Sequence, residues 1–197
     1  MTDLDVARKQ EIRYQLLCLL DSARPDWLDA GVTLRGLKVG ASPDDVGREL
    51  GYLQSRQLVE TRKVGDRQQA RLLATGVDLL EGNHPELMGL IILDDRLSQI
   101  EKERRKVLRW IVLRLGDRSR PIPLQEPLIQ RALHDVSFVV SAAELHRVLT
   151  YLEQKGLVQV DRRDDQAWQF SPTADGVDVC EYVRECPAGV GRPERYQ

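Results

Sequence analysis

Two arginines with matched surroundings, Arg48 and Arg147, are the side chains of this chain best suited to hold another molecule. Each stands six positions after a serine, Ser42 or Ser141, of the type that caps a helix. A guanidinium on an outward helix face presents donors in a fixed fork, which fits a guanine edge or a phosphate. The alternative is a solvated helix face on which the same arginine pairs with a neighbouring carboxylate.

Basic side chains continue from these helices into two segments predicted to be hairpins, where they suit contact with phosphates. Aspartates at both hairpin tips reduce the effect. Tyr52 is ambiguous between covering its helix and stacking on a base, and His146 is interpreted as a contact to a partner or to solvent. The candidate DNA-binding residues are Ser42, Arg48, Tyr52, Arg56, Arg62, Lys63, Arg67, Ser141, His146, Arg147, Thr150, Lys155, Arg162 and Arg163.

The sequence shows no arrangement typical of catalysis. Its three histidines, His84, His134 and His146, are isolated, and its three cysteines lack metal-ligand spacing. It has no glycine-rich phosphate loop and no recognisable nucleophile context. We therefore expect a non-catalytic protein that needs no cofactor, metal ion or small-molecule ligand.

The arginines match because the chain contains an internal duplication. Residues 42–59 and 141–158 are identical at seven of eighteen positions with a constant offset of 99. Arg13 and Arg109 belong to a matched block upstream, and residues 74–78 and 174–178 match downstream. Such a repeat predicts two domains of one fold. The expected boundaries are 1–82 for domain 1, 83–106 for a helical linker, 107–186 for domain 2 and 187–197 for a flexible tail.

Each repeat predicts the order helix, short helix, helix, hairpin and short helix, so the expected class is mostly α with small β-hairpins (α+β). The third helix of the first repeat begins at Pro43 and buries a stripe of Val46, Leu50 and Leu53. Glu49 and Tyr52 in the first copy, like Thr150 and Tyr151 in the second, are expected outside that stripe. The remaining predicted elements are helices near 12–20, 76–80 (capped by Thr75), 107–115, 127–134, 141–155 and 173–182, a weak element within 28–39, and strands 58–64, 69–74, 157–161 and 166–170.

This order, with a helix that runs through Gly-Leu-Val at 156–158 into a charged hairpin, resembles the winged helix-turn-helix fold over about 8–82 and 104–183. The resemblance implies a third helix in the major groove of DNA and a hairpin against the backbone or minor groove. The second repeat is also similar to small uncharacterised proteins of Mu-like phages and prophages, through Thr173–Val179 and the tail Pro187–Pro193. The first repeat lacks that tail, so any function carried by this family is expected in the second repeat.

We expect a cytoplasmic, phage- or prophage-type regulator of transcription that binds double-stranded DNA. The alternative is a protein-interaction module, because tandem winged helices are also similar to the kite subunits of chromosome-condensing complexes. The net charge of −2 favours the alternative, whereas residues 101–120 hold eight Lys/Arg against three Asp/Glu and favour DNA. The apolar stripe within 84–106 either packs on domain 1 or joins two chains as a homodimer. No membrane span or signal peptide is predicted.

Overall fold

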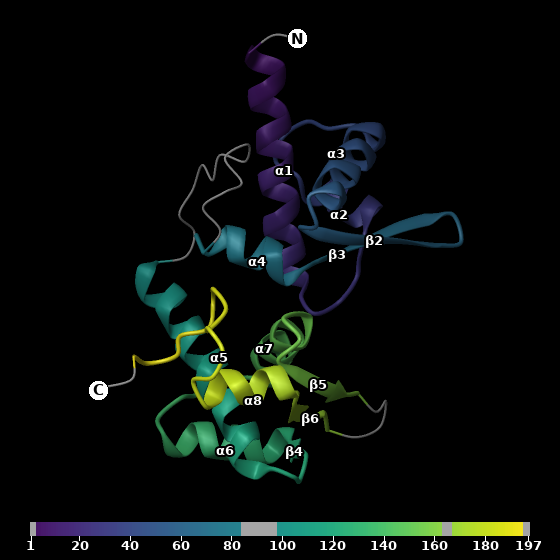
Figure 1. The fold of residues 1–197 in the computed structure, drawn as a ribbon. Coiled ribbons are helices and arrows are strands. Elements are labelled where there is room, and N and C mark those ends of the chain that lie inside the picture. The colour runs from purple at the N-terminus through teal and green to yellow at the C-terminus, as the bar shows by residue number, and fades with distance from the viewer. Residues whose placement is uncertain (1–2, 84–97, 163–166, 195–197) are drawn as a thin grey trace. The chain divides into compact units, whose positions relative to one another are not determined.

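The structure, a computed structural model, describes residues 3–83, 98–162 and 167–194. The protein is of mixed α and β type, as expected, with helices packed on two three-stranded antiparallel sheets in the described part (Figure 1). The chain divides into two compact units, Met1–Arg96 (unit 1) and Leu97–Gln197 (unit 2). Each unit has its own hydrophobic core.

Unit 1 follows the predicted order of elements with one strand added. Its sheet has the order β1-β3-β2, and α1 packs against α3, β3 and α4. The hairpin formed by β2 and β3 extends beyond the helices of this unit (Figure 1). Its elements are α1 (Asp3–Ala23), β1 (Leu28–Asp29), α2 (Ala30–Gly36), α3 (Pro43–Ser55), β2 (Val59–Val64), β3 (Arg67–Leu72) and α4 (Ala74–Leu80).

Local sequence explains where α3 begins. The Ser42 side chain accepts a hydrogen bond from the Asp45 backbone at 3.1 Å, and the Asp45 carboxylate accepts one from the Ser42 backbone at 3.1 Å. This capping box satisfies donors that a helix N-terminus otherwise leaves without partners. The predicted stripe of Val46, Leu50 and Leu53 is at most 1% exposed. The predicted start and buried face of this helix are confirmed.

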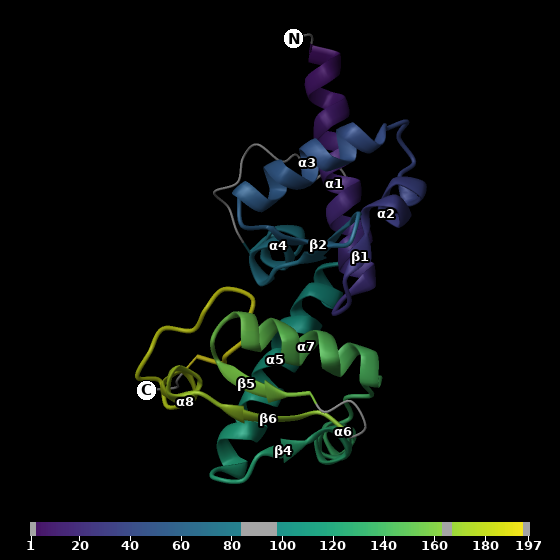
Figure 2. The ribbon, with the colours of Figure 1, turned by 90° about the vertical axis from the view of Figure 1, so that its right-hand side faces the viewer.

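Unit 2 has the same order of elements as unit 1, with a sheet of order β4-β6-β5. Figure 2 shows α7 lying alongside this sheet, and α7 packs against both β5 and α5. Phe170 fills the core, where a methyl group on Gly116 would stand 2.5 Å from its ring. The elements are α5 (Gln99–Ser119), β4 (Leu124–Gln125), α6 (Glu126–Asp135), α7 (Ala142–Gln154), β5 (Val158–Asp161), β6 (Gln169–Pro172) and α8 (Ala174–Cys180).

Several boundaries differ from the prediction. The two-residue strands β1 and β4 are too short for an alternating pattern, and only their pairing with β3 and β6 defines them. Helix α4 begins at Ala74 without a side-chain cap from Thr75, and β6 lies at Gln169–Pro172 rather than 166–170. Helix α5 begins at Gln99 and so absorbs the end of the expected linker. Residues 84–97, which hold most of the stripe proposed for dimerisation, lie outside the described residues.

The expected flexible tail is instead a packed segment up to Arg192, here called the strap (Pro187–Arg192). Tyr151 donates its hydroxyl proton to the Ala188 carbonyl at 2.9 Å, and the Gly191 amide donates to the Lys106 carbonyl at 3.0 Å. Val190 is 7% exposed. A methyl group on Gly191 would stand 3.0 Å from the Lys106 backbone, so glycine lets the strap approach α5 closely. Sequence composition alone does not reveal this contact.

Candidate nucleic-acid interface

The most exposed line of residues on α3 is Asp44, Arg48, Gly51 and Ser55, here called the outer stripe. Successive members are three or four positions apart, so they lie on one helix face. The Arg48 side chain is 61% exposed, and its nearest carboxylate oxygen, on Asp45, is 3.4 Å away. An exposed pair of this kind is worth at most about 1 kcal/mol and is easily exchanged for another partner. Arg48 is therefore available to an anion.

The β2–β3 hairpin adds three exposed cations, Arg62, Lys63 and Arg67. Arg62 donates to the Gln69 side chain at 2.9 Å and lies over the Trp27 ring, 4.1 Å from its centroid. Within the described residues, neither Lys63 nor Arg67 forms an ion pair. The hairpin therefore carries these three exposed cations against the exposed carboxylate of Asp66 at its tip, which leaves this end of the hairpin positive.

Helix α1 brings two cations to this face that the sequence analysis did not select. Arg8 donates to the Gly40 carbonyl at 2.7 Å and reaches the Asp45 carboxylate at 3.4 Å. Arg8, Lys9 and Arg48 border a shallow depression of about 180 Å³ between α1 and the start of α3. The amphipathic pattern of α1 gives no signal for this placement, because Arg8 and Asp45 are distant in sequence.

Asp45 is one of three acidic residues that line this depression, together with Asp5 and Glu49. Hydrogen bonds from the Ser42 backbone and side chain lower the pKa of its carboxyl group, and the charges of Arg8 and Arg48 lower it further. The carboxylate is therefore ionised at neutral pH, and it offsets one of the two flanking arginines. With three carboxylates and three cations, the lining of the depression has no net charge.

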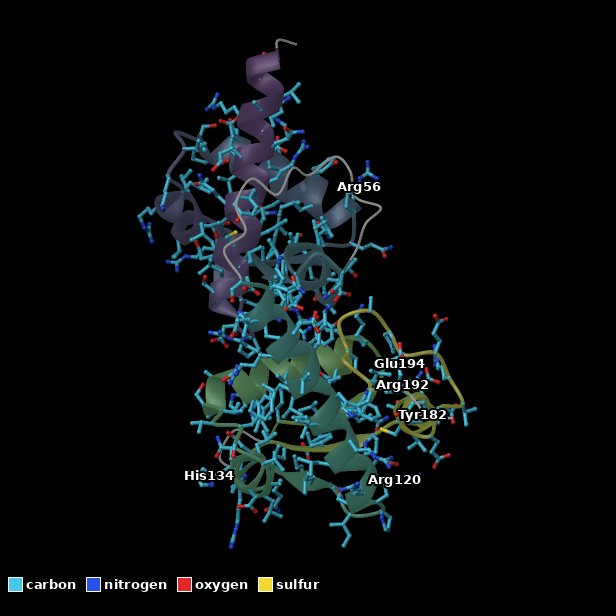
Figure 3. The ribbon with its side chains drawn as sticks, turned by 90° about the vertical axis from the view of Figure 1, so that its left-hand side faces the viewer. Arg56, Arg120, His134, Tyr182, Arg192 and Glu194 are labelled. Carbon is cyan, nitrogen blue, oxygen red and sulfur yellow. The ribbon has the colours of Figure 1, made fainter. Side chains whose placement is uncertain are left out.

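Two side chains of α3 that were expected to face outward are turned against α1. Glu49 is 2% exposed and pairs with Arg13 of α1 at 2.6 Å. Tyr52 is half-buried under the same arginine, whose guanidinium carbon lies 3.6 Å from the ring centroid. Tyr52 therefore covers its helix, which is one of the two roles predicted for it. Arg56 ends α3 and points away from the ribbon (Figure 3).

The matched face of unit 2 is built differently. Thr150, predicted to lie on the outward face, is buried at 8% exposure. Arg162 folds back from the end of β5, pairs with Glu153 and brings a guanidinium nitrogen 3.5 Å from the Thr150 hydroxyl. Repeat 1 has Gln54 at the position of Glu153, so it lacks the carboxylate that holds this arginine.

His146, also expected to face outward, lies against Trp168, the residue before β6, and against Glu126 of α6. Its ring stacks on Trp168 with 3.9 Å between centroids, and its Nε2 lies 3.1 Å from the Glu126 carboxylate. Repeat 1 has Gly47 at this position. Arg104 of α5 is paired with Glu144 of α7. Carboxylates therefore hold several cationic or titratable groups on this face.

The remaining candidate DNA-binding residues of unit 2 differ in their exposure and their contacts. Ser141 caps α7 by accepting from the Glu144 backbone at 3.2 Å. Arg147 is half-buried, and the half-buried Lys155 brings its ammonium 5.6 Å from the Tyr151 ring centroid. Arg163 lies outside the described residues.

No family model, curated protein or solved structure matches this chain. Function is therefore inferred from the two units alone. Within residues 3–83, 98–162 and 167–194, no group of three or more His, Cys, Asp or Glu side chains is placed to hold a metal ion. In the same part of the chain, no helix has the length and apolar character needed to span a bilayer.

Proposed function

We propose that this chain is a non-catalytic protein that binds double-stranded DNA through two winged-helix domains, with unit 1 providing the main contact. The observation that carries the proposal is the set of exposed cations on one helix and its neighbouring hairpin. Because phosphate contact depends on a local patch, the overall charge of −2 is compatible with it. The set consists of Arg48, Arg56, Arg62, Lys63 and Arg67.

In this arrangement α3 enters the major groove and the hairpin rests against the backbone or the minor groove. The outer stripe faces the base edges, and Lys63 and Arg67 approach phosphates from the hairpin. Arg8 supplies a further cation near the start of α3. Each phosphate neutralised releases condensed counterions, which provides most of the binding free energy at low salt.

The second repeat was the expected bearer of function, but the geometry favours the first. In unit 2, Glu153 and Glu144 hold Arg162 and Arg104, and His146 stacks on Trp168 where repeat 1 has Gly47. A face neutralised in this way supports the alternative role, contact with a protein partner. We therefore assign the kite-like alternative to unit 2. Gene regulation in the cytoplasm by a phage- or prophage-type protein, and a homodimer through 84–106, stay predictions.

The proposal is tested by measuring the affinity of the full chain for a mixed-sequence duplex over a salt series. Four phosphate contacts give a slope of log K against log salt of about −3.6, at roughly −0.9 per contact. The variant Lys63→Ala/Arg67→Ala is expected to flatten the slope by about two. Arg118→Ala is the matched control, because it removes an exposed cation from another surface. A flat salt response, unchanged in the double variant, would replace DNA binding with a protein-binding role.

A further inference from the structure

Few side chains of α3 are free to read base edges. In the outer stripe, Gly51 has no side chain, and the Ser55 hydroxyl donates to the Tyr52 carbonyl at 2.7 Å. Asp44 has no partner among the described residues, and Arg48 has only its weak contact to Asp45. Asp44 and Arg48 are therefore the two groups of the stripe that remain available.

The neighbouring line of α3 residues, which faces the hairpin, adds no side chain that is available to recognise a base. Gly47 has no side chain, and the carbonyl oxygen of the Gln54 amide accepts from the Thr61 hydroxyl at 2.7 Å. A glutamine recognises adenine through both atoms of its amide, one accepting and one donating. Because the amide oxygen of Gln54 already accepts the Thr61 hydrogen bond, Gln54 is not positioned for the two-atom pairing with adenine.

The spacing of the two available groups limits what they reach. Four residues of α-helix rise about 6 Å, which corresponds to roughly two base-pair steps of 3.4 Å. Arginine pairs with the O6 and N7 acceptors of guanine, and a carboxylate accepts from the N4 amino group of cytosine. Asp44 and Arg48 together thus fit one G·C pair, or two G·C pairs that lie at most two steps apart.

We infer that unit 1 binds duplex DNA of almost any sequence and distinguishes no more than two G·C base pairs, at most two steps apart. This inference rests on the proposed function and specifies its substrate. Gly47 and Gly51 have no side chains, so α3 can occupy the groove without contacting base edges at these two positions. Affinity comes instead from Lys63, Arg67 and the other cations that contact phosphates.

The test is selection of bound duplexes from a randomised library by the full chain at low salt, followed by sequencing. The expected result is a preference at no more than two positions, both G·C and at most two steps apart. Replacing the preferred pairs with A·T is expected to lower affinity by about 5- to 150-fold, the range of one good bidentate contact. Arg48→Lys keeps the positive charge but loses the two parallel N–H donors of the guanidinium. The preference for guanine should therefore disappear.

Two results would overturn the inference while leaving DNA binding intact. One is a run of three or more specified base pairs. The other is a G·C preference that survives unchanged in both Arg48→Lys and Asp44→Asn. If no duplex is retained at any salt concentration, the proposed function fails and this inference fails with it.

Discussion

The guanidinium carbon of Arg109 lies 3.8 Å from the centroid of the Tyr151 ring. Arg13 and Tyr52 form the same contact in unit 1, at 3.6 Å. The repeat matches the two arginines and the two tyrosines separately, and the fold brings each pair together between the first and third helices. The surroundings differ, because Arg13 is paired with the buried Glu49, whereas Arg109 donates to the Gly189 carbonyl of the strap at 2.9 Å.

The two tyrosine hydroxyls predict unequal effects on stability. Tyr151→Phe removes the hydrogen bond to Ala188 and should lower the free energy of unfolding by about 1 kcal/mol. Tyr52→Phe is the matched control, since the Tyr52 hydroxyl has no hydrogen-bond partner within the described residues, and it should change stability by less than about 0.5 kcal/mol. Urea unfolding of the two variants measures both values. Equal effects would contradict a structural role for the strap.

Removal of the strap should destabilise unit 2. Truncation after Cys186 loses the hydrogen bonds to Tyr151, Arg109 and Lys106 and exposes the Val190 site, at a cost of about 3 kcal/mol. Gly191→Ala keeps the chain length but forces the strap from α5 and should act in the same direction. Truncation after Glu194 serves as the control. Thermal unfolding that is identical for all three proteins would show that the segment contributes nothing.

The two matched arginines should differ in their effect on DNA binding. Arg48→Ala is expected to cost about 1–3 kcal/mol of binding free energy, because the side chain is exposed and faces the groove in the proposed complex. Arg147→Ala should cost less than about half of that, since Arg147 is half-buried on a face held by carboxylates. Titration of a labelled duplex with each variant gives the comparison. A larger loss for Arg147→Ala would move the DNA contact to unit 2.

Releasing the paired cation of unit 2 should create a new phosphate contact. Glu153→Gln places at this position the same residue type as Gln54 in repeat 1 and frees Arg162. We expect tighter binding to a mixed-sequence duplex and a salt slope steeper by about one. Glu185→Gln makes the same charge change at another exposed site and controls for net charge. If both variants bind equally, the carboxylate does not mask Arg162.

The buried thiol of Cys180 should resist modification at neutral pH. Burial, followed by the nearby Asp117 carboxylate, raises the pKa of Cys180 to about 11. A raised thiol pKa favours the neutral form in the fold, so its contribution to stability is complete below the unfolded-state pKa and is lost as pH rises through about 11. Alkylation at pH 8 with peptide mapping should modify the half-exposed Cys186 before Cys180. Equal rates in the native protein would contradict this.

Helix positions were predictable because their signals are local. Ser42, Pro43 and the stripe Val46–Leu53 act within a few residues of one another, so the bounds of α3 follow directly from the chain. The same holds for α7 after Ser141. Gln57, which follows the C-cap residue Arg56, is an exception: its φ is 57° where repeat 2 has Gly156 at 73°, and its residue type gives no local signal for that turn.

The sequence by itself therefore determined the duplication, the order of the main helices and hairpins, and which helix carries an arginine in each half. Only the tertiary structure decided which of those charges stay exposed. Glu49 meets Arg13, and Glu144 meets Arg104, across separations of 36 and 40 residues. Pairing across such distances depends on how helices pack, and a carboxylate brought against a cation by packing removes it from the surface offered to a partner. No local pattern encodes that choice.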